Sequence, residues 1–152
     1  MKILARQLTM DLYNCKNSKL KDIEATKKML GHLLNLANCQ PIDLHAHELS
    51  EDHFVVLSLF EEGHILLHVY PGYRYVAGDI FLFREDASPE LFFKEIRSFF
   101  KPDKTKTTFL KRGDFSASTE VRPKIKTRVA PLRKIHNTGA KVIRILARRN
   151  RQ

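Results

Sequence analysis

Apolar and polar residues alternate along much of the first 115 residues of this chain. Within residues 3–13, Leu8, Met10 and Leu12 are separated by single polar residues, which is the pattern of a strand with one buried face. The same period of two, with many β-branched and aromatic residues and with turn residues between the segments, recurs further along the chain. It predicts strands over residues 42–47, 53–60, 63–70 and 73–83, and a last strand over residues 104–111.

Two segments instead repeat their apolar residues every three or four positions, which predicts helices. The first runs from Leu20 to Ala37, and Asn17 or Ser18 is the expected N-cap residue. The second begins at Ser88, because proline follows at the first helical position. The residues expected to bury one face of this second helix are Leu91, Phe92, Ile96 and Phe99.

The order of elements is strand, helix, four strands, helix and strand. Short connections require the middle strands to be antiparallel. Helices on one face of an antiparallel sheet give an α+β fold, a two-layer α/β sandwich. If the other sheet face is apolar it needs a partner, so we expect a dimer.

Charge divides the chain into two parts. Of 27 Lys and Arg and 17 Asp and Glu, residues 116–152 hold 11 cations and one acid, so residues 1–115 hold 16 of each. We therefore predict a domain over residues 1–115 and a basic extension over residues 116–152, partly disordered or helical. Residues 116–131 have the composition of a linker, and residues 138–149 could form a basic amphipathic helix.

The chain shows few signs of secretion or membrane insertion. No apolar run reaches the roughly 20 residues that span a bilayer, and the N-terminus lacks the pattern of a signal peptide. Cys15 and Cys39 are too few for a disulfide framework and lack the C-x-x-C spacing. These features predict a cytoplasmic protein with reduced thiols.

Three motifs stand out along the chain. They are Asp11 to Cys15, then Glu62-x-His64-x-x-x-His68-x-x-Pro71 with Asp79-x-Phe81, and finally Arg112-Gly113. They resemble motifs of the short bacterial and archaeal S-adenosylmethionine decarboxylases, whose core reads Glu-Ser-His-x-x-x-His-x-x-Pro-Glu, followed by an Asp-x-Phe-x-Cys strand. The resemblance covers about residues 3–114 and implies the decarboxylase fold and a link to spermidine biosynthesis and polyamine metabolism.

The resemblance also implies a self-cleaving proenzyme in other members. There, the serine after the glutamate attacks the preceding carbonyl, and the resulting ester is converted to a pyruvoyl group that acts as an electron sink. This chain has Gly63 at that position, which supplies neither oxygen nor sulfur for the attack. We therefore expect no pyruvoyl cofactor.

Other family positions have changed as well. The resemblance places a second processing serine at Val55, a proton-donating cysteine at Phe83, a ribose-binding acid at Gly72 and an adenine-stacking aromatic at Leu49. His68 is the retained processing histidine. Tyr70, Glu62 and His64 remain as candidate ligand-binding residues for an S-adenosylmethionine-like or polyamine-like molecule.

Two further readings concern metal and nucleic acid. His64 and His68 share one strand face, and with His45 and His47 a metal site is conceivable, but no carboxylate or thiolate accompanies them, and we expect none. The basic extension would attract the phosphates of nucleic acid, the surface of an acidic protein or anionic lipid. The alternative is a solvated, disordered extension that binds nothing. The candidate cations are Lys141, Arg144, Arg148, Arg149 and Arg151.

The resulting hypothesis is a decarboxylase-related pseudoenzyme that binds a ligand or regulates a related subunit, as a homodimer or heteromer. The alternative is a nucleic-acid-associated protein that binds through its basic tail. A third hypothesis, new catalysis on this scaffold, has no visible nucleophile, metal cluster or phosphate loop in its favour.

Overall fold

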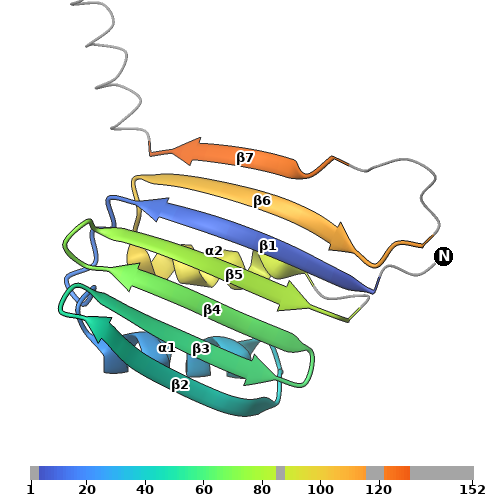
Figure 1. Cartoon of the computed structure of the whole chain (residues 1–152), viewed down its shortest axis with the longest axis horizontal. Coiled ribbons are helices and arrows are strands. Elements are labelled where there is room, and N and C mark those ends of the chain that lie inside the picture. The colour runs from blue at the N-terminus through green and yellow to red at the C-terminus, as the bar shows by residue number, and fades with distance from the viewer. Residues whose placement is uncertain (1–3, 85–87, 116–121, 131–152) are drawn as a thin grey trace, which may run out of the picture.

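The computed structural model describes residues 4–84, 88–115 and 122–130. These residues form one antiparallel sheet with two helices on the same face (Figure 1). The helices are α1 (Ile23–Leu36) and α2 (Pro89–Phe100). The strands are β1 (Ala5–Tyr13), β2 (Pro41–Ser50), β3 (His53–Phe60), β4 (Gly63–Tyr70), β5 (Tyr75–Leu82), β6 (Lys104–Arg112) and β7 (Lys124–Val129).

The strand order is β2-β3-β4-β5-β1-β6-β7. Strands β2 to β5 follow one another through short turns, so each lies beside the previous one. Strand β1 then fits between β5 and β6, antiparallel to both. The expected α+β, two-layer architecture is therefore confirmed.

One face of the sheet packs against the helices. Along β4 and β5 every second residue is buried, and the helices add their own apolar stripes. The ring of Phe60 from β3 stacks on Phe92 from α2, with centroids 5.9 Å apart. The largest side chains that are almost fully buried include Phe60, Phe100, Met10, Leu12, Leu30, Ile65, Leu67, Ile80 and Ile96.

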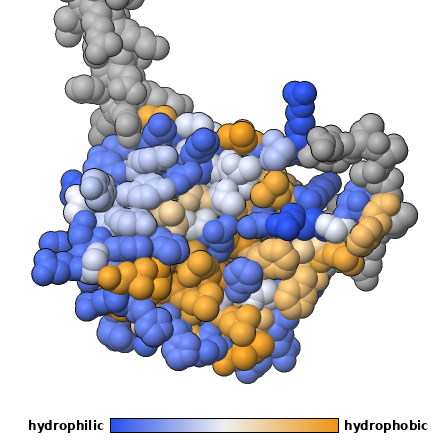
Figure 2. Space-filling view, viewed as in Figure 1, coloured by the Kyte–Doolittle hydropathy of each residue, from blue (hydrophilic) through white to orange (hydrophobic). Residues whose placement is uncertain are grey.

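No helix of the described residues covers the opposite face of the sheet, which we call the open face (Figure 1). Figure 2 shows this face with apolar side chains gathered over its lower part, where β3 and β4 lie. Leu57 and Leu59 of β3 are 40% and 41% exposed there. An exposed apolar sheet face of this kind is a candidate contact surface.

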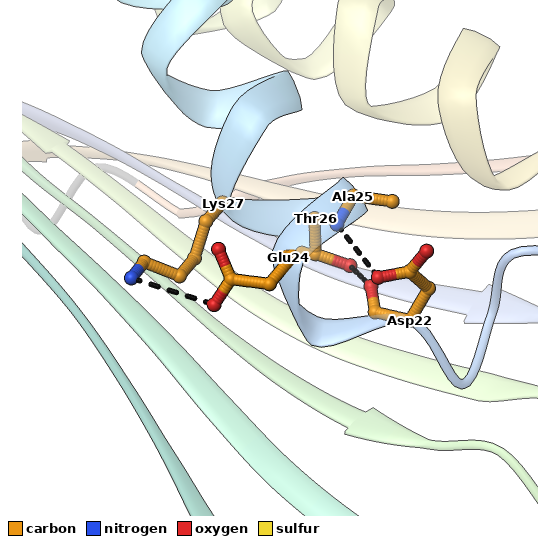
Figure 3. Close-up of polar contacts among 5 residues, drawn as sticks. All are labelled: Asp22, Glu24, Ala25, Thr26 and Lys27. Carbon is orange, nitrogen blue, oxygen red and sulfur yellow. Dashed lines mark hydrogen bonds and ion pairs between the residues drawn. The ribbon is translucent and has the colours of Figure 1, made fainter.

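Helix α1 starts later than the sequence predicts. Its N-cap is Asp22, whose carboxylate accepts a hydrogen bond of 2.9 Å from the N–H of Ala25 (Figure 3). Asn17 and Ser18 are wrong as cap residues. The side chain of Asn17 has other partners, because its oxygen accepts from the N–H of Lys19 and its nitrogen donates to the carbonyl of Phe99. Asn17 thus holds the preceding turn against α2.

Helix α2 begins as predicted, with Ser88 at the N-cap and Pro89 in its first turn. The predicted buried face is correct for Phe92 and Ile96 but wrong for Leu91, which is 66% exposed. The buried stripe follows residues 92, 93, 96 and 100 instead. These spacings of one, three and four keep one helical face toward the sheet, and Leu91 lies beside that face.

The expectation of a linker over residues 116–131 is wrong for residues 124–129. They form β7, which pairs with β6 from Lys104–Val129 to Phe109–Lys124. Ile125, Thr127 and Val129 alternate with cations, which is a strand pattern. Lysines suit an edge strand because they discourage further pairing. The division into a domain and a basic extension stays a prediction.

Among the described residues, no helix combines the length and apolar character needed to cross a bilayer.

Replacing Asp22 with alanine is expected to lower the free energy of unfolding by about 1 kcal/mol, because the N–H of Ala25 loses its acceptor. Chemical denaturation measures the change. Glu24→Gln is the matched control, because it removes only a 3.7 Å surface ion pair with Lys27 (Figure 3), worth about 0.5 kcal/mol or less. Equal losses in both variants would contradict the capping role.

Candidate functional site

Gly63 is the first residue of β4, and its backbone lies close to the neighbouring strand β5. Its φ is +156°, and a Cβ atom built on it would lie 1.8 Å from the carbonyl oxygen of Phe81. The chain is held there by a 2.9 Å hydrogen bond from the N–H of Phe83 to the carbonyl of Glu62. Because the obstructing atom belongs to the backbone, a side chain at position 63 requires the strands themselves to move.

A cavity of about 400 Å³ lies near this point on the helix side of the sheet, lined mainly by apolar residues of α1, α2 and β5. Glu62 enters it and pairs with Arg84, Nη1 to Oε1, at 3.3 Å. The other carboxylate oxygen of Glu62 is buried without a hydrogen-bond partner among the described residues. Glu62 is therefore a buried carboxylate in a cavity that also contains Arg84, Lys94 and Glu95.

Cys39 lines the same cavity. Burial, and then the negative charge of Glu62, raise the pKa of the Cys39 thiol to about 11. At neutral pH the thiol stays protonated, and a thiol is a much weaker nucleophile than a thiolate. Burial likewise raises the pKa of Cys15, to about 12. Neither cysteine is activated for attack.

His68 lies on the open face beside a second histidine. The Nδ1 atom of His68 is 2.9 Å from the Nε2 atom of His53, and the rings stack with centroids 5.2 Å apart. Burial lowers the pKa of His68, the proximity of His53 lowers it further, and Asp79 acts in the opposite direction. One nitrogen donates to the other, so at least one of the two rings is neutral.

Aromatic rings continue this cluster. Tyr70 stacks on His53, with centroids 4.1 Å apart, and contacts Tyr75 at 5.8 Å. The hydroxyl of Tyr75 donates a hydrogen bond to the carboxylate of Asp11. Burial, together with that carboxylate, raises the pKa of Tyr75. Tyr13 contacts Tyr75 with its ring tilted by 36°, and the Lys104 ammonium lies 5.0 Å from the centroid of the Tyr13 ring.

The predicted site residues lie in two separate places. Gly63 and His68 are five residues apart on one strand, about 16 Å at 3.3 Å per residue, and they point to opposite faces because the strand alternates. Glu62 lies at the helix-side cavity. His64 stacks on Phe81 on the open face, with centroids 5.3 Å apart. Tyr70 alone among the proposed ligand-binding residues shares a cluster with His68.

Other positions singled out by the resemblance are accounted for as follows. Val55 lies directly opposite His68 across the β3–β4 pair. The N–H of Gly72 donates a 2.6 Å hydrogen bond to Asp52, whose carboxylate occupies the space of a Cβ at position 72. Leu49 and Phe83 are exposed.

Metal binding finds no support in the part of the chain that the structure describes, where no group of three or more His, Cys, Asp or Glu residues could hold a metal ion. The Nε2 atom of His45 pairs with Asp43 at 3.0 Å instead. The cations Lys141, Arg144, Arg148, Arg149 and Arg151 lie outside the described residues.

Sequence reasoning missed His53 and the cavity beside Cys39. The signal for His53 was the register of the β3–β4 hairpin, which pairs Phe54 with Val69 and so puts residue 53 next to residue 70. The cavity depends on how both helices pack on the sheet, and residue periodicity does not report that. The histidine pair is the clearest titratable feature that the fold adds to the sequence.

Thermal stability is expected to fall as the pH drops from about 7.5 through 6.5, because the unfolded chain takes up a proton at the ordinary histidine pKa while folding holds the pKa of His68 lower. His68→Gln should show a shallower decline in melting temperature. His32→Gln, an exposed histidine on α1, is the control. A decline as steep in His68→Gln as in the original chain would contradict this reading.

Comparison with known proteins now identifies the scaffold. A family profile described as S-adenosylmethionine decarboxylase matches residues 6–113. The S-adenosylmethionine decarboxylase proenzyme of Methanococcus vannielii is 32% identical over 113 residues, which are 74% of this chain and 93% of the relative. The proenzyme of Thermodesulfovibrio yellowstonii is 29% identical over 123 residues, covering 81% of this chain and 91% of the relative.

A solved structure agrees on the fold. The crystal structure of the adenosylmethionine decarboxylase from Aquifex aeolicus superposes with a TM-score of 0.69 over 80% of this chain and 100% of that chain, at 18% identity. The motifs that suggested the resemblance therefore sit on the expected scaffold, and this chain belongs to the S-adenosylmethionine decarboxylase family.

Proposed function

We propose that this chain is a family member that is not self-cleaved, has no pyruvoyl group and acts by association as a regulatory subunit of S-adenosylmethionine or polyamine metabolism. The observation that supports this most directly is Gly63. Pyruvoyl formation needs a side-chain oxygen or sulfur at the residue that becomes the carbonyl group, and glycine has neither. The residues present do not fit that cofactor.

The surroundings of Gly63 support the same conclusion. The carbonyl of Phe81 occupies the place of a side chain at position 63, so the strands have closed around the glycine. Cys39, the nearest thiol along the cavity, has a raised pKa, and it is not part of the peptide bond that would be cleaved. His68 lies about 16 Å away along the strand, on the other face. No described group replaces the missing nucleophile.

Association is favoured by the open face. Its apolar part includes Leu57 and Leu59 (Figure 2), and removing such side chains from water is favourable by about 25 cal/mol per Å² of apolar surface before the costs of association. A second copy of this chain is the simplest occupant, and a related, serine-bearing subunit is the other. The expected S-adenosylmethionine-like or polyamine ligand stays a prediction, since Tyr70 lies apart from Glu62 in the described chain.

Nucleic-acid binding through Lys141, Arg144, Arg148, Arg149 and Arg151 remains the alternative. It rests on their charge alone, because these residues lie outside the described part of the chain.

Intact mass spectrometry of the purified chain is expected to show one polypeptide of 17.7 kDa, and carboxyl-labelled S-adenosylmethionine is expected to release no carbon dioxide above background. The Methanococcus vannielii relative, named a proenzyme, serves as the positive control. Two fragments meeting between Glu62 and Gly63, or measurable carbon dioxide release, would overturn the proposal.

Restoring the hydroxyl should not restore cleavage. Gly63→Ser is expected to remain uncleaved and to lose about 1–3 kcal/mol of stability or more, because its Cβ meets the Phe81 carbonyl. Gly31→Ser in α1 is the matched control, since nothing lies within 4 Å of a Cβ there and serine is the better helix former by about 0.5 kcal/mol. A stable, cleaved Gly63→Ser chain would show that only the hydroxyl was missing.

Light scattering is expected to give twice the 17.7 kDa chain mass if two copies associate, and Leu57→Glu should yield a monomer by placing a charge in the open-face contact. Leu91→Glu is the control, because Leu91 is a more exposed leucine in the helix layer. A monomeric original chain at micromolar concentration would contradict the homodimer.

A further inference from the structure

A groove runs between α2 and the β6–β7 pair, on the helix side of the sheet. It shares Lys94 with the cavity beside Glu62. It consists of two adjoining hollows of about 480 and 590 Å³. The hollows share Arg97 of α2, Thr105 of β6 and Arg128 of β7. They therefore form a continuous depression, which we call the basic groove.

Cations dominate the lining of the basic groove. They come from α2 and its C-cap on one side and from β7 on the other: Lys94, Arg97, Lys101, Lys126 and Arg128. The acids in the lining are Glu90 and Asp103. Five cations and two acids leave an excess of three positive charges. Lys104 also lines the groove, but its ammonium lies over the Tyr13 ring on the open face.

The two acids have other polar partners. Asp103 accepts a 2.6 Å hydrogen bond from the side chain of Asn14, and Glu90 accepts one of 2.7 Å from the hydroxyl of Ser88. Among the described residues, Lys94, Lys126 and Arg128 form no ion pair. Like charges gathered in one depression repel one another, and a bound anion relieves that repulsion.

The side-chain alternation of β7 concentrates this charge. Lys126 and Arg128 lie opposite Thr107 and Thr105, whose positions face the helix layer. Threonine and serine hydroxyls are common phosphate ligands beside Lys and Arg, and Ser98 adds another hydroxyl to the lining. The polar groups of the basic groove are thus almost all suited to phosphate oxygens.

The length of the basic groove and the lack of exposed aromatic residues in its lining indicate which class of ligand it could bind. The lining on α2 runs from Glu90 to Lys101, about 16 Å at 1.5 Å per residue, which is far longer than one phosphate. Phe93 is the aromatic residue of the lining and is buried, so no ring is presented for bases to stack on. An extended chain of phosphates fits this better than a single ion.

We propose that the basic groove binds the phosphate backbone of nucleic acid without reading its sequence. Part of its wall comes from β7, which follows the end of the family match at residue 113. The same stretch of chain, residues 116–152, holds 11 cations and one acid. This binding is independent of the proposed regulatory role and does not require it.

The test uses the full chain and fluorescein-labelled oligonucleotides, single- and double-stranded, in fluorescence anisotropy across a salt series. The double variant Lys126→Gln, Arg128→Gln is expected to weaken binding about tenfold and to reduce the slope of log K against log salt by about two, one per lost phosphate contact. Circular dichroism and the melting temperature check that the variant folds.

The matched control is Lys21→Gln, Lys28→Gln, which removes the same charge from exposed positions outside the groove and should change binding less than threefold. Equal weakening in both pairs, or none in the groove variant, would overturn the proposal in favour of the remaining basic tail. If millimolar inorganic phosphate competes with the oligonucleotide, the ligand of the groove is a single phosphate and not nucleic acid. If poly-glutamate binds as tightly as the oligonucleotide, the ligand is an acidic protein.

Discussion

Side-chain alternation along β4 decides which groups this chain can bring together. Gly63, Ile65, Leu67 and Val69 face the helices, whereas His64, Leu66, His68 and Tyr70 face the open side. Two residues of opposite parity on one strand cannot meet on one face. Gly63 therefore shares its surroundings with the helix-side cavity, and His68 with His53 and the tyrosines. Chemistry that needed both positions at once would have to take one of them from another chain.

Gly63 and Gly72, which stand where the resemblance places functional side chains, differ in what now occupies the space of the missing side chain. At Gly72 the space of a side chain is occupied by the carboxylate of Asp52, which can rotate away. At Gly63 it is occupied by the carbonyl of Phe81, which is fixed by the hydrogen bonds of the β4–β5 pair. Loss of a side chain at position 72 is therefore easily reversed, whereas at position 63 the backbone has closed over the site. This difference is the reason to expect that a single serine would not rebuild the nucleophile.

Much of the fold could be predicted from residue patterns, because alternation and turn residues determine strands directly. The bounds of β3 and β4 are those expected. The predicted N-cap of α1 is wrong because several polar residues precede the helix and any of them could cap it. The contact of the Asn17 side chain with the Phe99 carbonyl engages Asn17 elsewhere, and periodicity does not report such a tertiary contact. Strand β7 was missed because its high charge resembles a linker. The pairing of His53 with His68 depends on strand register, which periodicity alone leaves open.

The open face and the basic groove lie on opposite sides of the sheet. Alternate side chains of β7 face one or the other of these two surfaces. Ile125 and Thr127 pair with Thr108 and Lys106 on the open side, while Lys126 and Arg128 face the helix layer. A partner covering the open face would therefore leave the groove accessible. Because an added edge strand needs only the free edge of β6, it could bring a second binding surface to the family scaffold without disturbing the core between β1 and the helices.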